Sequence, residues 1–99
     1  MYARISIAQV QPDKYDESLA IWRDAVVPAA KQQAGFQSVF VLGDRATGKT
    51  YSITLWETEA DAVRTLDSDY MRGVLAQFAP VLAGRPVQEN LEVLLHEGA

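Results

Sequence analysis

Two strand-like runs joined by a short loop are the feature that most constrains how this chain can fold. The runs are Phe36–Leu42 and Tyr51–Trp56, and both are rich in aromatic and β-branched residues. The loop Asp44–Lys49 joins them, and its Gly48 can supply the positive φ angle that such loops commonly need. The sequence therefore predicts a β-hairpin at its centre.

The same loop matches a nucleotide-binding motif letter for letter. Residues 43–50 read GDRATGKT, which satisfies the phosphate-loop pattern G-x-x-x-x-G-K-[ST]. A phosphate loop must open a helix, because the first backbone N–H groups of that helix hold the phosphates. Here a strand-like run follows the loop, so we interpret the motif as a turn without phosphate affinity.

The first part of the chain predicts a strand and a helix. Tyr2–Val10 is strand-like, and Lys14–Ala34 repeats apolar residues every three or four positions, which is typical of an amphipathic helix. Pro28 lies within that helix and should kink it. Gly35 follows as a helix stop.

The remaining elements complete a known order. Thr58 is expected to cap a short helical turn, and Asp67-Ser68-Asp69 offers the N-cap of a second helix, which Pro80 should end. Val87–His96 is the final strand-like run. The order β-α-β-β-α-β predicts one domain over residues 1–99, of the α+β class, with a ferredoxin-like fold and a four-stranded antiparallel sheet.

Both faces of this predicted sheet are apolar. By strand alternation, Phe36, Phe40 and Leu42 point to one face, and Val39 and Val41 point to the other. Two helices can cover only one face. We therefore expect a second copy of the chain to cover the other face, which gives a homodimer.

Composition excludes several function classes. The net charge is −4 and the basic residues are scattered, which disfavours nucleic-acid binding. The chain has no cysteine, so thiolate chemistry and disulfides are excluded. No metal-ligand spacing, secretory signal or membrane-length apolar run is visible, so we expect a cytoplasmic protein without bound metal.

Several segments resemble the antibiotic biosynthesis monooxygenase (ABM) family of the dimeric α+β barrel superfamily. They are Val26–Lys31, Gly35-Phe36, Leu42–Lys49 and Thr54–Asp61. The resemblance spans nearly the whole chain and implies a homodimer whose two sheets face each other. It also implies a small pocket between each sheet and its own helices.

The resemblance implies two kinds of chemistry. Characterised relatives include cofactor-independent oxygenases of quinols and anthrones, and also haem-degrading enzymes. The haem degraders use an Asn on the first strand and a His on the second helix, whereas this chain has no Asn on the first strand and its single histidine is His96. We therefore expect no haem and no other cofactor, and a monooxygenase that acts on an electron-rich aromatic molecule.

Residues carried over from the anthrone oxygenases match only in part. Those enzymes have an Asn four residues before the third-strand Trp, where this chain has Ser52 before Trp56. The expected Tyr position holds Ala62, with Tyr70 and Arg72 nearby. We predict that Trp56 stacks on a flat substrate and that Arg72 stabilises a developing anion, so these two are the candidate catalytic residues.

Four further residues are candidates for substrate binding, namely Trp22, Ser52, Thr54 and Tyr70. Ser52 and Thr54 share a strand face with Trp56 and would supply the few polar groups that a pocket needs. The alternatives are that both tryptophans are core residues and that Arg72 is a solvated helix residue.

Three functions stay open at this point. The first is the oxygenase, and the second is a non-catalytic dimeric module that binds a small molecule or serves a structural role. The third is an isomerase or dehydratase on the same scaffold. A fold alone does not choose among them.

Overall fold

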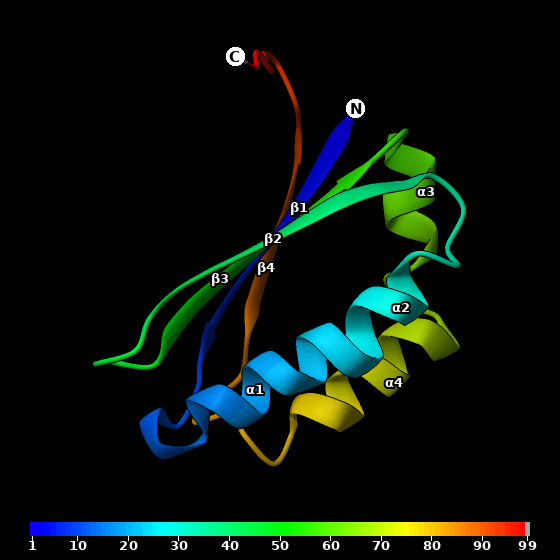
Figure 1. Cartoon of the computed structure of the whole chain (residues 1–99). Helices are drawn as coiled ribbons and strands as arrows, with labels where there is room; N and C mark the ends of the chain where they lie inside the picture. The colour runs from blue at the N-terminus through cyan, green and yellow to red at the C-terminus, as the bar shows by residue number, and fades with distance from the viewer. Residues whose placement is uncertain (99) are drawn as a thin grey trace.

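The computed structural model describes residues 1–98 and shows one sheet with its helices on one face (Figure 1). The strands are β1 (Tyr2–Gln9), β2 (Phe36–Asp44), β3 (Lys49–Trp56) and β4 (Val87–Glu92). They form a four-stranded antiparallel sheet in the order β2-β3-β1-β4. The predicted α+β class, element order and sheet are confirmed.

The first helical segment is continuous but changes its winding. It consists of a short 3₁₀ turn, α1 (Tyr15–Ile21), a π-helical segment (Trp22–Val26) and α2 (Val27–Ala30). In the π turn the Val27 N–H donates to the Trp22 carbonyl. Pro28 follows directly; it has no N–H, and its ring would crowd the carbonyl four residues earlier, which a wider turn relieves. The change of winding lies directly before Pro28, whereas the kink predicted at Pro28 itself stays a prediction, and the helix ends at Ala30, before the expected Ala34.

Two capped helices follow the hairpin, α3 (Glu59–Arg64) and α4 (Asp69–Phe78). The Thr58 hydroxyl accepts from the Asp61 N–H at 3.1 Å, and the Ser68 hydroxyl accepts from the Met71 N–H at 3.2 Å. Both predicted caps are confirmed. Helix α4 stops two residues before Pro80, also as predicted. Among residues 1–98, no helix has both the length and the apolar character needed to cross a bilayer.

The central hairpin forms as predicted, with β3 following the loop where a phosphate loop would open a helix. Gly48 has a φ of 81°, and a Cβ there would collide with the Val10 carbonyl oxygen. Gly43 is also required, because a Cβ there would overlap the hydroxyl of buried Tyr15. The hairpin thus fits closely against helix α1 at Gly43 and against the end of β1 at Gly48.

A β-bulge changes the face of the sheet to which Phe36 points. Phe36 pairs with Trp56, but the register shifts between Phe36 and Ser38, so that Phe40 pairs with Ile53. The extra residue moves Phe36 to the helix-covered face, where its ring meets Trp56 edge-on at 5.7 Å between centroids. Simple alternation from Phe40 had placed Phe36 on the opposite face, and that prediction was wrong.

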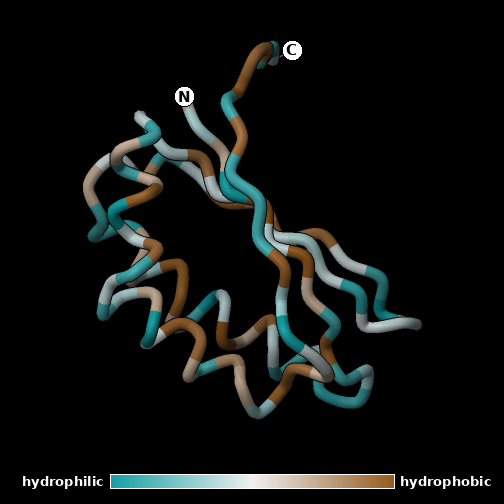
Figure 2. The backbone as a smooth tube through the Cα atoms, turned by 180° about the vertical axis from the view of Figure 1, so that it is seen from behind, coloured by the Kyte–Doolittle hydropathy of each residue, from teal (hydrophilic) through white to brown (hydrophobic). Residues whose placement is uncertain are grey.

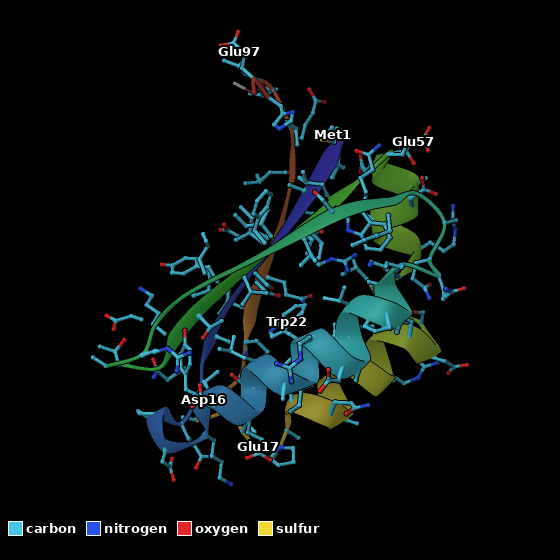
Figure 3. All side chains as sticks on the ribbon, in the orientation of Figure 1. Met1, Asp16, Glu17, Trp22, Glu57 and Glu97 are labelled. Atoms are coloured by element: carbon cyan, nitrogen blue, oxygen red, sulfur yellow. The ribbon has the colours of Figure 1, made fainter. Side chains whose placement is uncertain are left out.

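The last strand is shorter than predicted. Strand β4 ends at Glu92, although the Val93 N–H still donates to the Met1 carbonyl at 3.0 Å. Beyond it, Leu94 and Leu95 are 86% and 83% exposed. The segment projects past the sheet, as the position of Glu97 shows in Figure 3. His96 lies in this segment, away from the sheet.

The hydrophobic core lies between the helices and one end of the sheet. It is built around Val26, Phe78 and Val81, with partly buried apolar side chains packed against them. Hydrophobic residues recur along the strands as well as the helices in the view from behind (Figure 2). The Trp22 and Phe78 rings pack with their centroids 5.3 Å apart. This aromatic pair bounds the space described next.

Candidate functional site

A cavity of about 80 Å³ lies between the helix-covered face of the sheet and the helices above it. Its floor carries polar side chains that come from three strands, namely Arg4, Ser6, Thr50, Ser52, Thr54 and Gln88. Its opposite wall is mainly apolar and comes from the helices, with Trp22, Val26, Met71, Val74, Leu75 and Phe78. The cavity therefore has one polar side and one apolar side, as small-molecule sites commonly do.

Strand register explains why the polar residues gather in one place. Ser6 of β1 lies opposite Ser52 of β3 and opposite Gln88 of β4. Directly opposed residues in an antiparallel sheet point to the same face. Arg4 forms a second row with Thr54 and Asn90 in the same way. Local polarity alternates along each strand, and the pairing lines it up across the sheet.

The π-helical segment shapes the apolar wall. Trp22 begins this segment and Val26 ends it, and both line the cavity. Figure 3 shows Trp22 on the helix that faces the covered side of the sheet, drawn below the sheet in this view. The wider turn changes the direction of the side chains that follow it, and π turns often occur at functional sites.

Arg4 is the one charged side chain among the residues that line the cavity, and it is only 5% exposed. Its Nη2 donates to the Ala62 carbonyl and, at 2.7 Å, to the Thr65 hydroxyl. Its Nε lies 3.4 Å from the Asn90 side-chain oxygen, and the guanidinium lies 5.5 Å from the Trp56 ring centroid. All of these partners are neutral.

Burial lowers the pKa of the Arg4 guanidinium, and the nearby Tyr70 hydroxyl acts in the opposite direction. Arginine is so basic that Arg4 still carries its positive charge at neutral pH. Burial raises the pKa of Tyr70, while Arg4 opposes that rise. Tyr70 is therefore protonated at neutral pH and can donate a hydrogen bond into the cavity that it lines.

The structure brings all four predicted substrate-binding residues to this cavity. Trp22, Ser52, Thr54 and Tyr70 all line it, although they come from two helical segments and one strand. Their role in binding a ligand stays a prediction. Arg4 was missed by the sequence analysis. The available signal was its place in β1, where Arg4 alternates with Ala3 and Ile5, which point to the opposite face of the sheet.

The two predicted catalytic residues lie elsewhere. Trp56 is fully buried, is not part of the cavity lining, and donates its indole N–H to the Thr54 hydroxyl at 3.0 Å. Arg72 points to solvent, with its side chain 63% exposed, and pairs with Asp67 at 3.3 Å and Asp69 at 2.5 Å. Trp56 is adjacent to two residues that line the cavity, Arg4 and Thr54. Arg72 is on the outer side of α4.

Residues 1–98 contain no group of three or more His, Asp or Glu side chains arranged to hold a metal ion. The cavity lining in this part of the chain also lacks any carboxylate or imidazole. Its polar groups are hydroxyls, one amide and one guanidinium. These groups can bind and orient oxygen atoms of a ligand, but none is a general base near neutral pH.

Comparison with known proteins shows the family. The model of the antibiotic biosynthesis monooxygenase (ABM) family matches residues 1–77. This match covers most of the chain, including strands β1, β2 and β3 and most of the helical wall of the cavity, and it ends before β4. The chain belongs to the ABM family.

Relatives in sequence are two uncharacterised proteins of Mycobacterium tuberculosis. Rv2557 is 30% identical over 93 residues, which are 94% of this chain and 41% of that protein. Rv2558 is 30% identical over 106 residues, covering 100% of this chain and 44% of that protein. The chain thus spans less than half the length of the curated relatives that it matches.

Solved structures share the fold at low sequence identity. A proposed antibiotic biosynthesis monooxygenase from Caulobacter crescentus superimposes with a TM-score of 0.79 at 20% identity, covering 95% of this chain and 90% of that one. A variant of SnoaB, a cofactor-independent oxygenase from Streptomyces nogalater, gives 0.74 at 12% identity, with 96% and 94% covered. At these identities the likeness concerns the fold alone.

Proposed function

We propose that this protein is a cofactor-independent monooxygenase that acts on a small electron-rich aromatic molecule, with the cavity as its active site. The observation that carries the proposal is the two-sided cavity in a member of the ABM family. An aromatic ring would lie against Trp22 and the aliphatic wall, and its oxygen substituents would face the serine and threonine hydroxyls. The cofactor-independent oxygenase SnoaB, which shares the fold, supports the same reaction class.

The cavity size narrows the substrate. A cavity needs roughly 10–15 Å³ of accessible volume to hold one water, so a cavity of about 80 Å³ has room for roughly five to eight waters. That space corresponds to a ligand of one or two rings. A one- or two-ring quinol therefore fits better than a three-ring anthrone, part of which would extend out of the cavity.

The proposed reaction uses the substrate as the reductant. A deprotonated phenol or quinol gives an electron to O₂, and the two radicals combine to form a peroxide at the ring carbon. The peroxide takes up a proton, which replaces the one that the phenol lost, and water then leaves with the hydrogen of that ring carbon to give a carbonyl. One oxygen atom thus enters the substrate and the other leaves as water. The protein supplies position, exclusion of water and hydrogen-bond donors toward the anion.

A second candidate function has its own support. The cavity lining described above contains no carboxylate or imidazole to remove a proton. A substrate that does not ionise by itself would be bound without reaction. This observation favours the alternative of a non-catalytic dimeric module that binds a small molecule.

We also propose a homodimer that forms through the open face of the sheet. Phe40, Leu42, Val87 and Leu91 are 54%, 53%, 60% and 51% exposed. The register places Phe40 beside Ile53 and Leu91 beside Ala3 on this face. A sheet face with several exposed large apolar side chains is typical of a protein interface rather than a free surface.

Oxygen consumption across a panel of one- and two-ring quinols and anthrones tests the oxygenase. We expect uptake of one O₂ per carbonyl formed, and we expect Val74→Trp to abolish it by filling the cavity. The matched control is Val63→Trp, because Val63 is 48% exposed on α3 and does not line the cavity. Binding without oxygen uptake would favour the module, and turnover without oxygen would favour an isomerase or dehydratase.

A further inference from the structure

The charge of Arg4 has no counter-charge in the described part of the chain. Among residues 1–98, no carboxylate forms a salt bridge with Arg4, and Tyr70 is the only ionisable side chain that acts noticeably on its pKa. Four arginines do form salt bridges, and the side chains of all four are more than half exposed to solvent. Buried charges are normally paired, since removing an ion from water is costly. Arg4 is the exception in this fold.

The guanidinium also has donor capacity to spare. Its Nε and Nη2 have acceptors, whereas no acceptor within residues 1–98 contacts Nη1. Every fully buried polar side-chain atom in this part of the chain has a partner, so Nη1 is not fully buried. Arg4 lines the cavity, and Nη1 is its guanidinium nitrogen without an acceptor in the described residues. Tyr70 lies close enough to interact electrostatically with Arg4 and offers a second donor.

We infer that the cavity binds an anionic ligand, a small aromatic carboxylate whose oxygens accept hydrogen bonds from Nη1 of Arg4 and from the Tyr70 hydroxyl. The neutral partners Ala62 and Thr65 fix the guanidinium plane, so the site is already oriented before the ligand arrives. A carboxylate would supply the missing charge in a place shielded from water, where a charge-assisted hydrogen bond is strong.

The aromatic part of the ligand would extend away from Arg4. The rows of the floor run from Arg4 and Thr54 to Ser6 and Ser52, and then to Thr50 beside Ala8. The apolar wall lies above these rows, with Trp22 and Phe78 as its aromatic members. The inference rests on the cavity of the proposed function, but it is independent of the oxygen chemistry.

A pair of probes that differ in one group tests the inference. The probes are 1-hydroxy-2-naphthoate and its neutral analogue 1-hydroxy-2-naphthamide, and binding is measured by calorimetry under argon so that no oxidation accompanies it. We expect the acid to bind about tenfold or more tightly than the amide, as one charge-assisted hydrogen bond supports. Equal binding of the two probes to the wild-type protein would overturn the inference without any variant.

Variants then assign the preference to Arg4. Arg4→Gln should remove the preference for the acid, because the lost charge weakens acid binding more than amide binding, and Arg4→Lys should keep part of the preference because the charge remains. The control is Arg23→Gln, an exposed arginine of the helical layer whose side chain is 73% exposed. If Arg4→Gln does not fold, Arg4→Lys and Tyr70→Phe still test the site. Retention of the full preference in folded Arg4→Gln would overturn the inference.

The two proposals can fail separately. Selective binding of the acid without oxygen uptake by any quinol would sustain the anion site and refute the oxygenase. Oxygen uptake with neutral quinols, together with equal binding of acid and amide, would sustain the oxygenase and refute the anion site.

Discussion

The face of the sheet beneath the helices carries Arg4, Ser6, Ser52 and Thr54, whereas the opposite face carries mainly apolar side chains such as Ile53. The covered face thus has a polar part at the cavity beside the apolar Phe36, Val39 and Trp56, whereas the uncovered face is mainly apolar. A sheet with one solvated face normally shows the reverse. The difference supports both proposals made above. The covered face has polar groups for a small aromatic ligand with oxygen substituents, and the open face has apolar side chains for a second copy of the chain.

The two faces also differ in how they are built. The covered face meets a helical layer that contains the irregular π turn, and a cavity remains between them. The open face is formed by strand pairing that stays in register across all four strands, except for the bulge at the start of β2. A regular apolar face can pack against a copy of itself, whereas an irregular cover leaves room for a ligand.

The largest expected effect concerns the open face. Ile53 lies at its centre, opposite Ile5 on one side and Phe40 on the other. Ile53→Glu would place a carboxylate from each copy in the interface, so we expect the dimer dissociation constant to rise by about 10³-fold or more in sedimentation. Val63→Glu, on the exposed side of α3, should leave the dimer unchanged. A wild-type monomer at micromolar concentration would refute the dimer.

The next effect concerns Trp56 and the covered face. Its side chain is fully buried against Phe36 and Arg4. We expect Trp56→Ala to lower the free energy of unfolding by about 3–5 kcal/mol in urea denaturation, and Trp56→Phe to lower it less. A Trp56→Ala variant that keeps wild-type stability but binds ligand weakly would instead support the stacking role predicted from the sequence.

The hairpin turn joins two strands that contribute to both faces of the sheet. A defect in the turn should therefore lower the stability of the whole sheet. Gly48→Val forces a positive φ on a β-branched residue and drives its Cβ into the Val10 carbonyl, which we expect to cost about 2 kcal/mol or more in urea denaturation. Gly73→Ala is the matched control. Gly73 lies within α4, and no neighbouring atom comes within 4 Å of the place that an alanine methyl would take, so this change should stabilise the protein by about 0.5–1 kcal/mol. The reverse order of stabilities would contradict the prediction.

The smallest effect is expected at Arg72. Its exposed pairs with Asp67 and Asp69 resemble surface salt bridges, which contribute about 0–1 kcal/mol. We expect Arg72→Gln to change stability within that range and to leave oxygen uptake and acid binding at wild-type levels. Loss of turnover in this variant would restore the catalytic role that the sequence predicted for Arg72.

Features that depend on neighbours in sequence were predictable. The Thr58 and Ser68 caps, the end of α4 before Pro80 and the positive φ of Gly48 each follow from the chemistry of a few adjacent residues. The order of elements followed from hydrophobic periodicity. Trp22 and Tyr70 were placed near a pocket because their helices were expected on one face of the sheet, and both do line the cavity.

Features that depend on register were not predictable. The bulge between Phe36 and Ser38 reverses the face of Phe36, and no local signal marks the extra residue. The position of Arg4 beneath α3 likewise depends on pairing between residues far apart in the chain, such as Arg4 with Thr54. For this reason Arg72, which lies next to the expected helix start, was predicted as the positively charged residue of the pocket.

Local conformational preference and period-two patterning were enough to predict the fold class, the hairpin in place of a phosphate loop, and a sheet with apolar residues on both faces. Which residues meet was settled only when the whole chain was folded. Folding enclosed Arg4 with neutral partners, lined up the serine and threonine hydroxyls under the helices, and buried Trp56 away from the cavity. These outcomes depend on strand register and helix packing, which bring distant residues within ångströms and which no short stretch of sequence encodes.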